Sequence, residues 1–257
     1  MNTLDEKLAA FRRLLEIMDE LREKCPWDQK QTNDTLRNLT IEETYELADA
    51  ILEKSDDDIK QELGDLLLHI VFYARIGSEK EQFDIADIIN ALNEKLIFRH
   101  PHVFGDVQVN DQEDVKKNWE ELKMREGRTV LGGVPGSLPA MIKSNRIQEK
   151  VKAVGFDWER KDQIWDKVSE ELSELKEEVK NGDRGKIESE FGDLLFSVIN
   201  AARLYGIDPE TALEKTNKKF IKRFNYLEKS TLSNGQLLKD MSLDEMNEIW
   251  EQAKEYD

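Results

Sequence analysis

The chain has a single cysteine, Cys25, among its 257 residues. One cysteine cannot form a disulfide within the chain, which is typical of proteins from a reducing compartment. The five prolines and 13 glycines are also few, and no segment approaches the ~18 consecutive apolar residues of a membrane-spanning helix. The N-terminal stretch MNTLDEKLAAFRRLLEIM contains acidic residues and no continuous apolar run, unlike a signal peptide. We therefore expect a cytoplasmic protein that does not associate with membranes.

Positive charge is scarce. The chain contains 38 Lys and Arg residues against 55 Asp and Glu residues, which gives a net charge of −17. A protein that binds DNA or RNA normally needs a basic face to neutralise phosphates, and no segment is dense in Lys and Arg. We therefore expect no direct binding to nucleic acid. A small anionic ligand stays compatible with this charge if metal ions accompany it, because bound cations invert the local electrostatics.

Strand-like alternation is almost absent, and apolar residues recur at helical spacing along most of the chain. The fold class is therefore predicted to be all-α. Asp208 precedes Pro209 as an expected N-cap, and Ser242 with Glu245 forms an expected capping box. Helices are predicted over residues 4–24, 34–54, 57–77, 84–99, 112–126, 139–153, 162–181, 186–205, 208–230 and from 242 onward.

The most informative feature is an internal repeat. EETYEL at 42–47 and ELGDLL at 62–67 recur as EELSEL at 170–175 and EFGDLL at 190–195, both at an offset of 128 residues. NEKLIFR at 93–99 recurs as NKKFIKR at 217–223. The repeat predicts two homologous helical domains, 1–110 and 151–257, joined by a helical linker with a Gly/Pro loop over 111–150.

The repeated blocks place carboxylates on one helical face. Residues three and four apart are neighbours on a helix, and the short break between the two blocks of each repeat favours an antiparallel pair. Several carboxylates would then face one another in each domain. The N-terminal set is Glu42, Glu43, Glu46, Glu62 and Asp65, and the C-terminal set is Glu170, Glu171, Glu174, Glu190 and Asp193.

Facing carboxylates repel one another, and their burial requires compensation. A set of oxygen ligands suits a hard divalent cation such as Mg²⁺ or Mn²⁺. The Glu-x-x-His pairs of di-iron bundles are absent. The alternative is a solvated acidic face without a metal, and the duplication of the pattern argues against it for the repeated carboxylates. We assign Glu177 and Glu178 to such a solvated face, because they have no repeated counterpart. Gly64 and Gly192 lie in the middle of predicted helices, where glycine lowers helix stability by about 1 kcal/mol relative to alanine. Their presence at matching positions predicts close helix approach or a crowded site.

Basic residues follow each acidic set. Lys95 and Arg99 lie four residues apart, as do Lys219 and Arg223, so each pair shares a helical face. They are suited to hold phosphate oxygens. Ordinary ion pairing with the many acidic side chains is the alternative.

The ordered set EExxE, ExxD and NxKxxxR, together with CPWDQKQT, RHPHVFGD and SLPAMIKSNRIQEKVKAVGFDW, resembles the MazG nucleoside triphosphate pyrophosphohydrolases over almost the whole chain. The resemblance implies an all-α NTP pyrophosphatase fold whose four-helix sites bind Mg²⁺, usually in a homodimer. It implies hydrolysis of NTPs or dNTPs to a nucleoside monophosphate and pyrophosphate, as a house-cleaning activity. Mn²⁺ is a possible substitute for Mg²⁺.

The resemblance also assigns roles to residues, with the C-terminal domain expected to carry the activity. Catalytic roles fall to Glu170, Glu171, Glu174, Glu190 and Asp193, with Glu170 a candidate to position or deprotonate water and Glu171 and Glu174 as alternatives for that role. Metal ligands are expected at Glu171, Glu174, Glu190 and Asp193, and at Glu43, Glu46, Glu62 and Asp65 in the N-terminal domain. Substrate binding is expected from Lys167, Lys219, Lys222, Arg223 and Trp250, and from Lys95 and Arg99. Trp250 is equally suited to anchor the last helix.

Two other functions fit parts of the pattern. A helical interaction protein could bind a basic partner or divalent ions without turnover, although it would not need basic pairs at matching positions in both repeats. A related enzyme could act on phosphoribosyl-ATP or on dUTP alone, but the tandem architecture and the RHPHVFGD segment argue against it. The sequence does not predict the preferred base or sugar.

Overall fold

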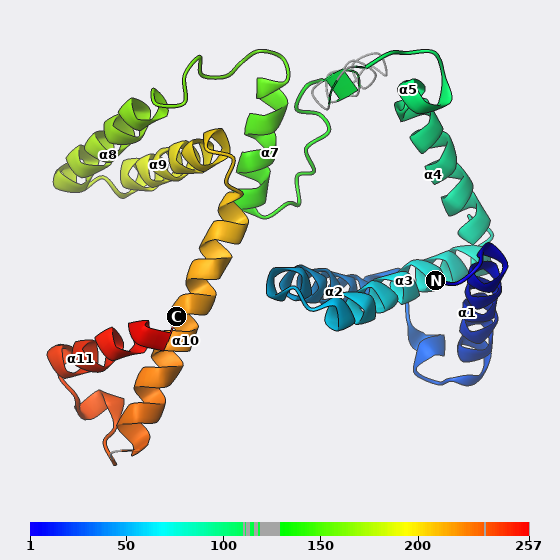
Figure 1. Cartoon of the computed structure of the whole chain (residues 1–257), viewed down its shortest axis with the longest axis horizontal. Coiled ribbons are helices and arrows are strands. Elements are labelled where there is room, and N and C mark those ends of the chain that lie inside the picture. The colour runs from blue at the N-terminus through cyan, green and yellow to red at the C-terminus, as the bar shows by residue number, and fades with distance from the viewer. Residues whose placement is uncertain (110, 112–113, 116–117, 119–128, 234, 257) are drawn as a thin grey trace. The chain divides into compact units, whose positions relative to one another are not determined.

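The computed structural model describes the chain except for residues 110, 112–113, 116–117, 119–128, 234 and 257, and divides into two compact units, Met1–Val109 and Asn110–Asp257 (Figure 1). The described residues form helices, turns and loops with no β-strand, which confirms the all-α prediction. Most of the helix predicted over 112–126 lies outside the described residues. No helix in the described part of the chain is long and apolar enough to cross a membrane.

The four long helices of the first unit begin at side chains that cap free N–H groups of their first turn. Thr3 accepts a hydrogen bond from the backbone N–H of Glu6 at 3.3 Å, and Asp84 accepts bonds from the N–H groups of Ala86 and Asp87. The elements are α1 (Leu4–Lys24), η1 (Asp28–Lys30), α2 (Asn33–Glu53), α3 (Asp56–Glu79), α4 (Ile85–Arg99) and α5 (Pro101–Phe104).

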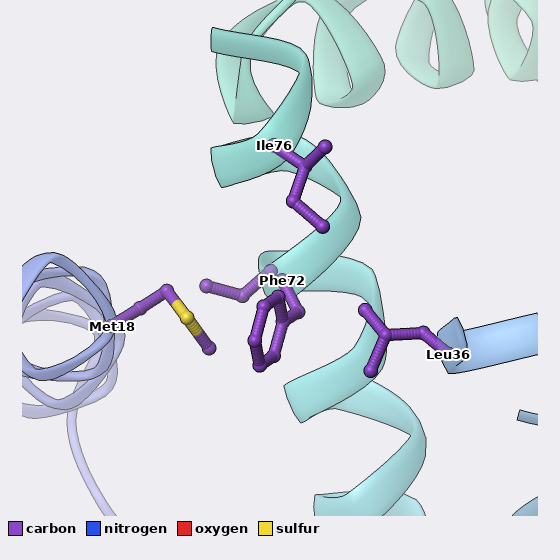
Figure 2. Packing of buried hydrophobic residues seen from close by; sticks show 5 residues of the cluster. Met18, Leu36, Phe72 and Ile76 are labelled. Carbon is purple, nitrogen blue, oxygen red and sulfur yellow. The ribbon is translucent and has the colours of Figure 1, made fainter. Parts of the chain in front are cut away.

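The core of this unit lies where α1, α2 and α3 meet (Figure 2). Met18 from α1, Leu36 from α2, and Val71, Phe72 and Ile76 from α3 are each at most 3% exposed. Ion pairs at the edge of this core join α1 to α3, with Arg22 and Glu79 bonded through Nε and Oε1 at 2.9 Å. The core thereby fixes the start of α2 and the last part of α3, and so holds the helix pair that carries the repeated carboxylates.

The second unit is built from α7 (Ala140–Lys152), α8 (Ile164–Asn181), α9 (Arg184–Leu204), α10 (Pro209–Ser233), η2 (Leu238–Asp240), α11 (Leu243–Ala253) and η3 (Lys254–Tyr256). Most residues of α7 belong to the predicted linker over 111–150, yet α7 packs against α9 and α10. The buried Gln148 side chain of α7 donates from Nε2 to the backbone carbonyl of Phe196 on α9 at 2.9 Å. This contact anchors α7 beside the helix that carries Glu190.

The two helix caps predicted in this unit are confirmed. Asp208 accepts a hydrogen bond from the N–H of Thr211 at 2.8 Å, and Pro209 is the first helical residue of α10. Ser242 and Glu245 form the expected reciprocal capping box of α11. Local side-chain chemistry was therefore sufficient to locate these helix ends.

Replacing Phe72 by Ala should destabilise the first unit by about 3–5 kcal/mol, because the change leaves a cavity in a core that α1, α2 and α3 share. Urea unfolding followed by circular dichroism measures the effect. The matched control is Phe156→Ala, since Phe156 is 79% exposed and its loss should change stability by less than about 0.5 kcal/mol. Equal effects of the two changes would contradict the assignment of this core.

Candidate metal and phosphate site

Each unit contains a pair of helices joined by a tight turn, and the repeated carboxylates lie on these pairs. Lys54 adopts a left-handed conformation (φ 56°) between α2 and α3, and Gly182 does the same (φ 78°) between α8 and α9. A residue in the left-handed conformation ends the helix and turns the chain back on itself. The two helices of each pair therefore run side by side (Figure 1). Carboxylates distant in sequence can then face one another.

In the second unit, Glu171 and Glu174 of α8 and Glu190 of α9 converge. Each of the three offers a carboxylate oxygen that lies within 4.8 Å of the others. Glu171 is only 6% exposed, and Oε2 of Glu190 is buried without a hydrogen-bond partner in the described structure. Asp193, the fourth expected ligand, lies outside this set. The arrangement can hold a metal ion with three carboxylates from two helices.

The electrostatics of this set are unfavourable without a cation. Burial raises the pKa of Glu190, and the negative charges of Glu174, Asp193, Glu171 and Glu178 raise it further. Asp193 is thus close enough to act on Glu190 through its charge. A divalent cation would remove the repulsion that the raised pKa reports.

Lys167 supplies a positive charge within the same helix. Its Nζ lies 3.0 Å from Oε1 of Glu170 and 2.8 Å from Oε1 of Glu171. Hydrogen bonds to Glu171 and then to Glu170 raise the pKa of Lys167. The lysine therefore stays charged and covers two of the expected catalytic carboxylates, Glu170 and Glu171.

In the first unit, Glu43 of α2 and Glu62 and Asp65 of α3 form a corresponding set, again with oxygens within 4.8 Å of one another. Glu62 is 7% exposed, and its Oε2 is buried without a hydrogen-bond partner among the described residues. Burial is the largest cause that raises the pKa of Glu62, followed by the charges of Glu46, Asp65 and Glu43. Glu46 itself lies outside the converging set.

The expected phosphate-binding residues lie on other helices. Lys95 and Arg99 belong to α4, and Lys219, Lys222 and Arg223 belong to α10. The Arg223 guanidinium lies over the Trp250 ring at 5.8 Å from its centroid, and the Phe220 ring lies 4.9 Å from that centroid. Trp250 thus packs against α10. The structure gathers this aromatic and basic group where α10 packs against α11.

Two interpretations from the sequence are wrong. Glu178 is not merely solvated charge, because its Oε2 is buried and its charge acts on Glu190. It lies one turn beyond Glu174, so helical spacing alone could have found it. The mid-helix glycines do not mark close approach within the chain, since a Cβ atom added to Gly64 or Gly192 would meet no described atom within 4 Å.

Replacing Glu190 by Gln should raise the melting temperature of the metal-free protein more at pH 8 than at pH 5.5. The raised pKa of Glu190 means that the folded state holds this proton more tightly than the unfolded state. Its contribution to stability is therefore present at low pH and lost as the pH rises through the folded-state pKa. Glutamine cannot lose a proton, so this loss disappears.

Scanning calorimetry in EDTA at both pH values measures this difference, with Glu177→Gln as the control, because Glu177 is exposed on the same pair of helices. An equal shift at both pH values would show that Glu190 does not carry the expected electrostatic strain.

Comparison with known proteins agrees with this duplicated arrangement. The family model described as "MazG nucleotide pyrophosphohydrolase domain" matches residues 31–104 and 160–227, which contain the two helix pairs. A nucleoside triphosphate pyrophosphohydrolase/pyrophosphatase MazG from Thermotoga maritima is 45% identical over 250 residues, covering 95% of each chain. A nucleoside triphosphate pyrophosphohydrolase from Escherichia coli K12 is 42% identical over 252 residues, covering 94% of this chain and 96% of the relative.

A longer protein from Bacillus subtilis, the uncharacterized protein YabN, is 45% identical over 98% of this chain and 53% of its own length. Sequence similarity therefore extends along nearly the whole chain in two relatives of similar length, and it also covers about half of the longer YabN protein. Since the family model also covers more than half of the chain, in two copies, this protein belongs to the MazG nucleotide pyrophosphohydrolase family.

Proposed function

We propose that this protein hydrolyses nucleoside triphosphates, NTPs or dNTPs, to the nucleoside monophosphate and pyrophosphate in a reaction that depends on Mg²⁺. The observation that carries the proposal is the convergence of Glu171, Glu174 and Glu190 around a buried carboxylate oxygen without a partner. The printed names of the relatives from Thermotoga maritima and Escherichia coli support the same activity. The role is nucleotide-pool house-cleaning.

Magnesium suits this site because its ligands are all carboxylate oxygens, which hard divalent cations prefer. Glu171, Glu174 and Glu190 would hold it, with Asp193 completing the set, and Mn²⁺ could replace it. Bound there, the ion would neutralise the triphosphate and lower the pKa of a water molecule. Glu170, whose side chain is exposed, would orient that water and accept its proton.

The basic residues complete the proposed substrate site. Lys167, at the carboxylates already, would exchange Glu170 and Glu171 for phosphate oxygens when a nucleotide binds. Lys219, Lys222 and Arg223 would hold further phosphate oxygens. Trp250 offers an aromatic face for the base, and its contact with Arg223 keeps that face beside a cation. The N-terminal set of Glu43, Glu46, Glu62 and Asp65, with Lys95 and Arg99, forms a second site of the same kind.

A homodimer would cover the apolar face that each helix pair leaves open. Leu63 and Leu67 flank Gly64, and Phe191 and Leu195 flank Gly192; all four apolar side chains are exposed in the single chain. The space beside each glycine is also open. A second copy packed there would bury these side chains and convert a helix pair into a four-helix arrangement. A net charge of −17 fits a cytoplasmic enzyme that does not bind nucleic acid directly.

Replacing Glu174 by Gln should lower kcat by about 100-fold or more, since it removes one of three converging oxygen ligands. The assay measures monophosphate and pyrophosphate released from ATP in Mg²⁺. Glu177→Gln, an exposed change one turn away on the same helix, is the matched control and should leave kcat within about twofold. Full activity in a folded Glu174→Gln protein would refute the assignment of the catalytic site to the second unit.

A further inference from the structure

The two carboxylate sets differ at one position that the repeat aligns. At the offset of 128 residues, Lys167 corresponds to Leu39. Leu39 packs against the apolar core of the first unit, beside residues such as Leu36 and Phe72. The first unit therefore has an apolar side chain where the second has an ammonium group in contact with Glu171.

The second unit supplies cations to its own acids. Lys167 contacts Glu170 and Glu171 at 3.0 and 2.8 Å. Glu178, the additional acid of this unit, corresponds to Ala50 in the first unit, and it has a cation of its own in Lys186 at 3.8 Å. The extra negative charge is thus accompanied by an extra positive one, and Lys167 remains as a counter-charge for the shared carboxylates.

The first unit has no such counter-charge. Among the described residues, no ion pair reaches Glu43, Glu62 or Asp65, whose oxygens lie within 4.8 Å of one another. Glu62 is more than nine-tenths buried, its Oε1 accepts a long bond of 3.4 Å from Gln61, and its Oε2 has no hydrogen-bond partner among the described residues. An unpaired buried carboxylate is costly. The converging carboxylates of the first unit therefore lack the compensating ammonium group that Lys167 supplies in the second unit.

We propose that the N-terminal carboxylate set binds a divalent cation in the absence of nucleotide, and binds it more tightly than the C-terminal set does, because Lys167 competes there for Glu171. The inference rests on the proposed metal-binding role of both sets and adds the order in which they fill. A cation that enters the second unit must first displace the Lys167 ammonium from Glu171, whereas no lysine or arginine is paired with the converging carboxylates in the described part of the first unit. The base that acts on this set is the buried His69 imidazole beside Asp65, and burial lowers the pKa of His69. A hydrogen bond between charged groups of this kind corresponds to about a tenfold difference in affinity.

Titration of the full chain with Mn²⁺ tests this order, with free Mn²⁺ measured by electron paramagnetic resonance after removal of metal with EDTA and without nucleotide. Wild-type protein should show one tighter and one weaker site per chain, separated by about tenfold. Glu62→Gln should abolish the tighter site and leave the weaker one. Glu190→Gln should do the opposite.

The decisive variant is Lys167→Met, which removes the charge and keeps most of the side-chain volume. It should tighten the weaker site by about tenfold and leave the tighter site unchanged. Lys180→Met is the matched control, since Lys180 is exposed on the same helix, and it should change neither site. Circular dichroism of each variant checks that it is folded.

Three results would overturn the inference. Two sites of equal affinity that do not respond to Lys167→Met would show that the lysine does not compete. Loss of the tighter site in Glu190→Gln rather than Glu62→Gln would reverse the order. Absence of Mn²⁺ binding at both sites would overturn the order as well, and it alone would also remove the metal-binding role on which the proposed function rests.

Discussion

Several carboxylates of like charge lie together between two helices in each half of this chain, and their repulsion is the constraint on which the account depends. The cores of the two units hold the helices in place, and tight turns at Lys54 and Gly182 bring the acids into opposition. The raised pKa values of Glu62 and Glu190, first from burial and then from neighbouring charges, report the cost of this arrangement. Helix packing alone would not favour the placement of these carboxylates side by side. A bound cation would compensate for their repulsion.

Both halves of the chain carry the same cluster of repelling carboxylates, but they differ in the positive charge that lies beside it. The second unit carries Lys167 against Glu170 and Glu171, whereas the first unit has Leu39 at that place and uses it in the core. Lys167 offsets part of the repulsion between these carboxylates, and in the proposed reaction it would exchange them for phosphate oxygens when a nucleotide binds. The first unit lacks this exchange, so the same ligand pattern is suited to a more permanent ion. Under this proposal, the difference between Lys167 and Leu39 makes the second unit suited to nucleotide turnover and the first unit suited to retaining a metal ion.

Much of the fold could be predicted from sequence because its signals are local. Helical spacing and side chains such as Asp208 and Ser242 located the helices and their caps, and the 128-residue offset located the two helix pairs. The details of the sites depend on packing between helices, which spacing does not specify. The sequence could not tell that Glu46 and Asp193 stay outside the converging sets, or that the space beside Gly64 and Gly192 is open. Comparison of the two repeats shows Glu178 in place of Ala50 and Lys167 in place of Leu39. Only the structure shows that Glu178 acts on Glu190 and that Lys167 contacts Glu171.

In the proposed reaction, water directed by these carboxylates attacks the α-phosphate of the nucleoside triphosphate and releases pyrophosphate. Hydrolysis of ATP in ¹⁸O-labelled water, in the presence of Mg²⁺, tests this attack most directly, with the products separated and weighed by mass spectrometry. The account predicts AMP that carries one ¹⁸O atom and pyrophosphate that carries none. Label in the pyrophosphate, or ADP with phosphate as the products, would place the attack on another phosphorus atom and contradict the account.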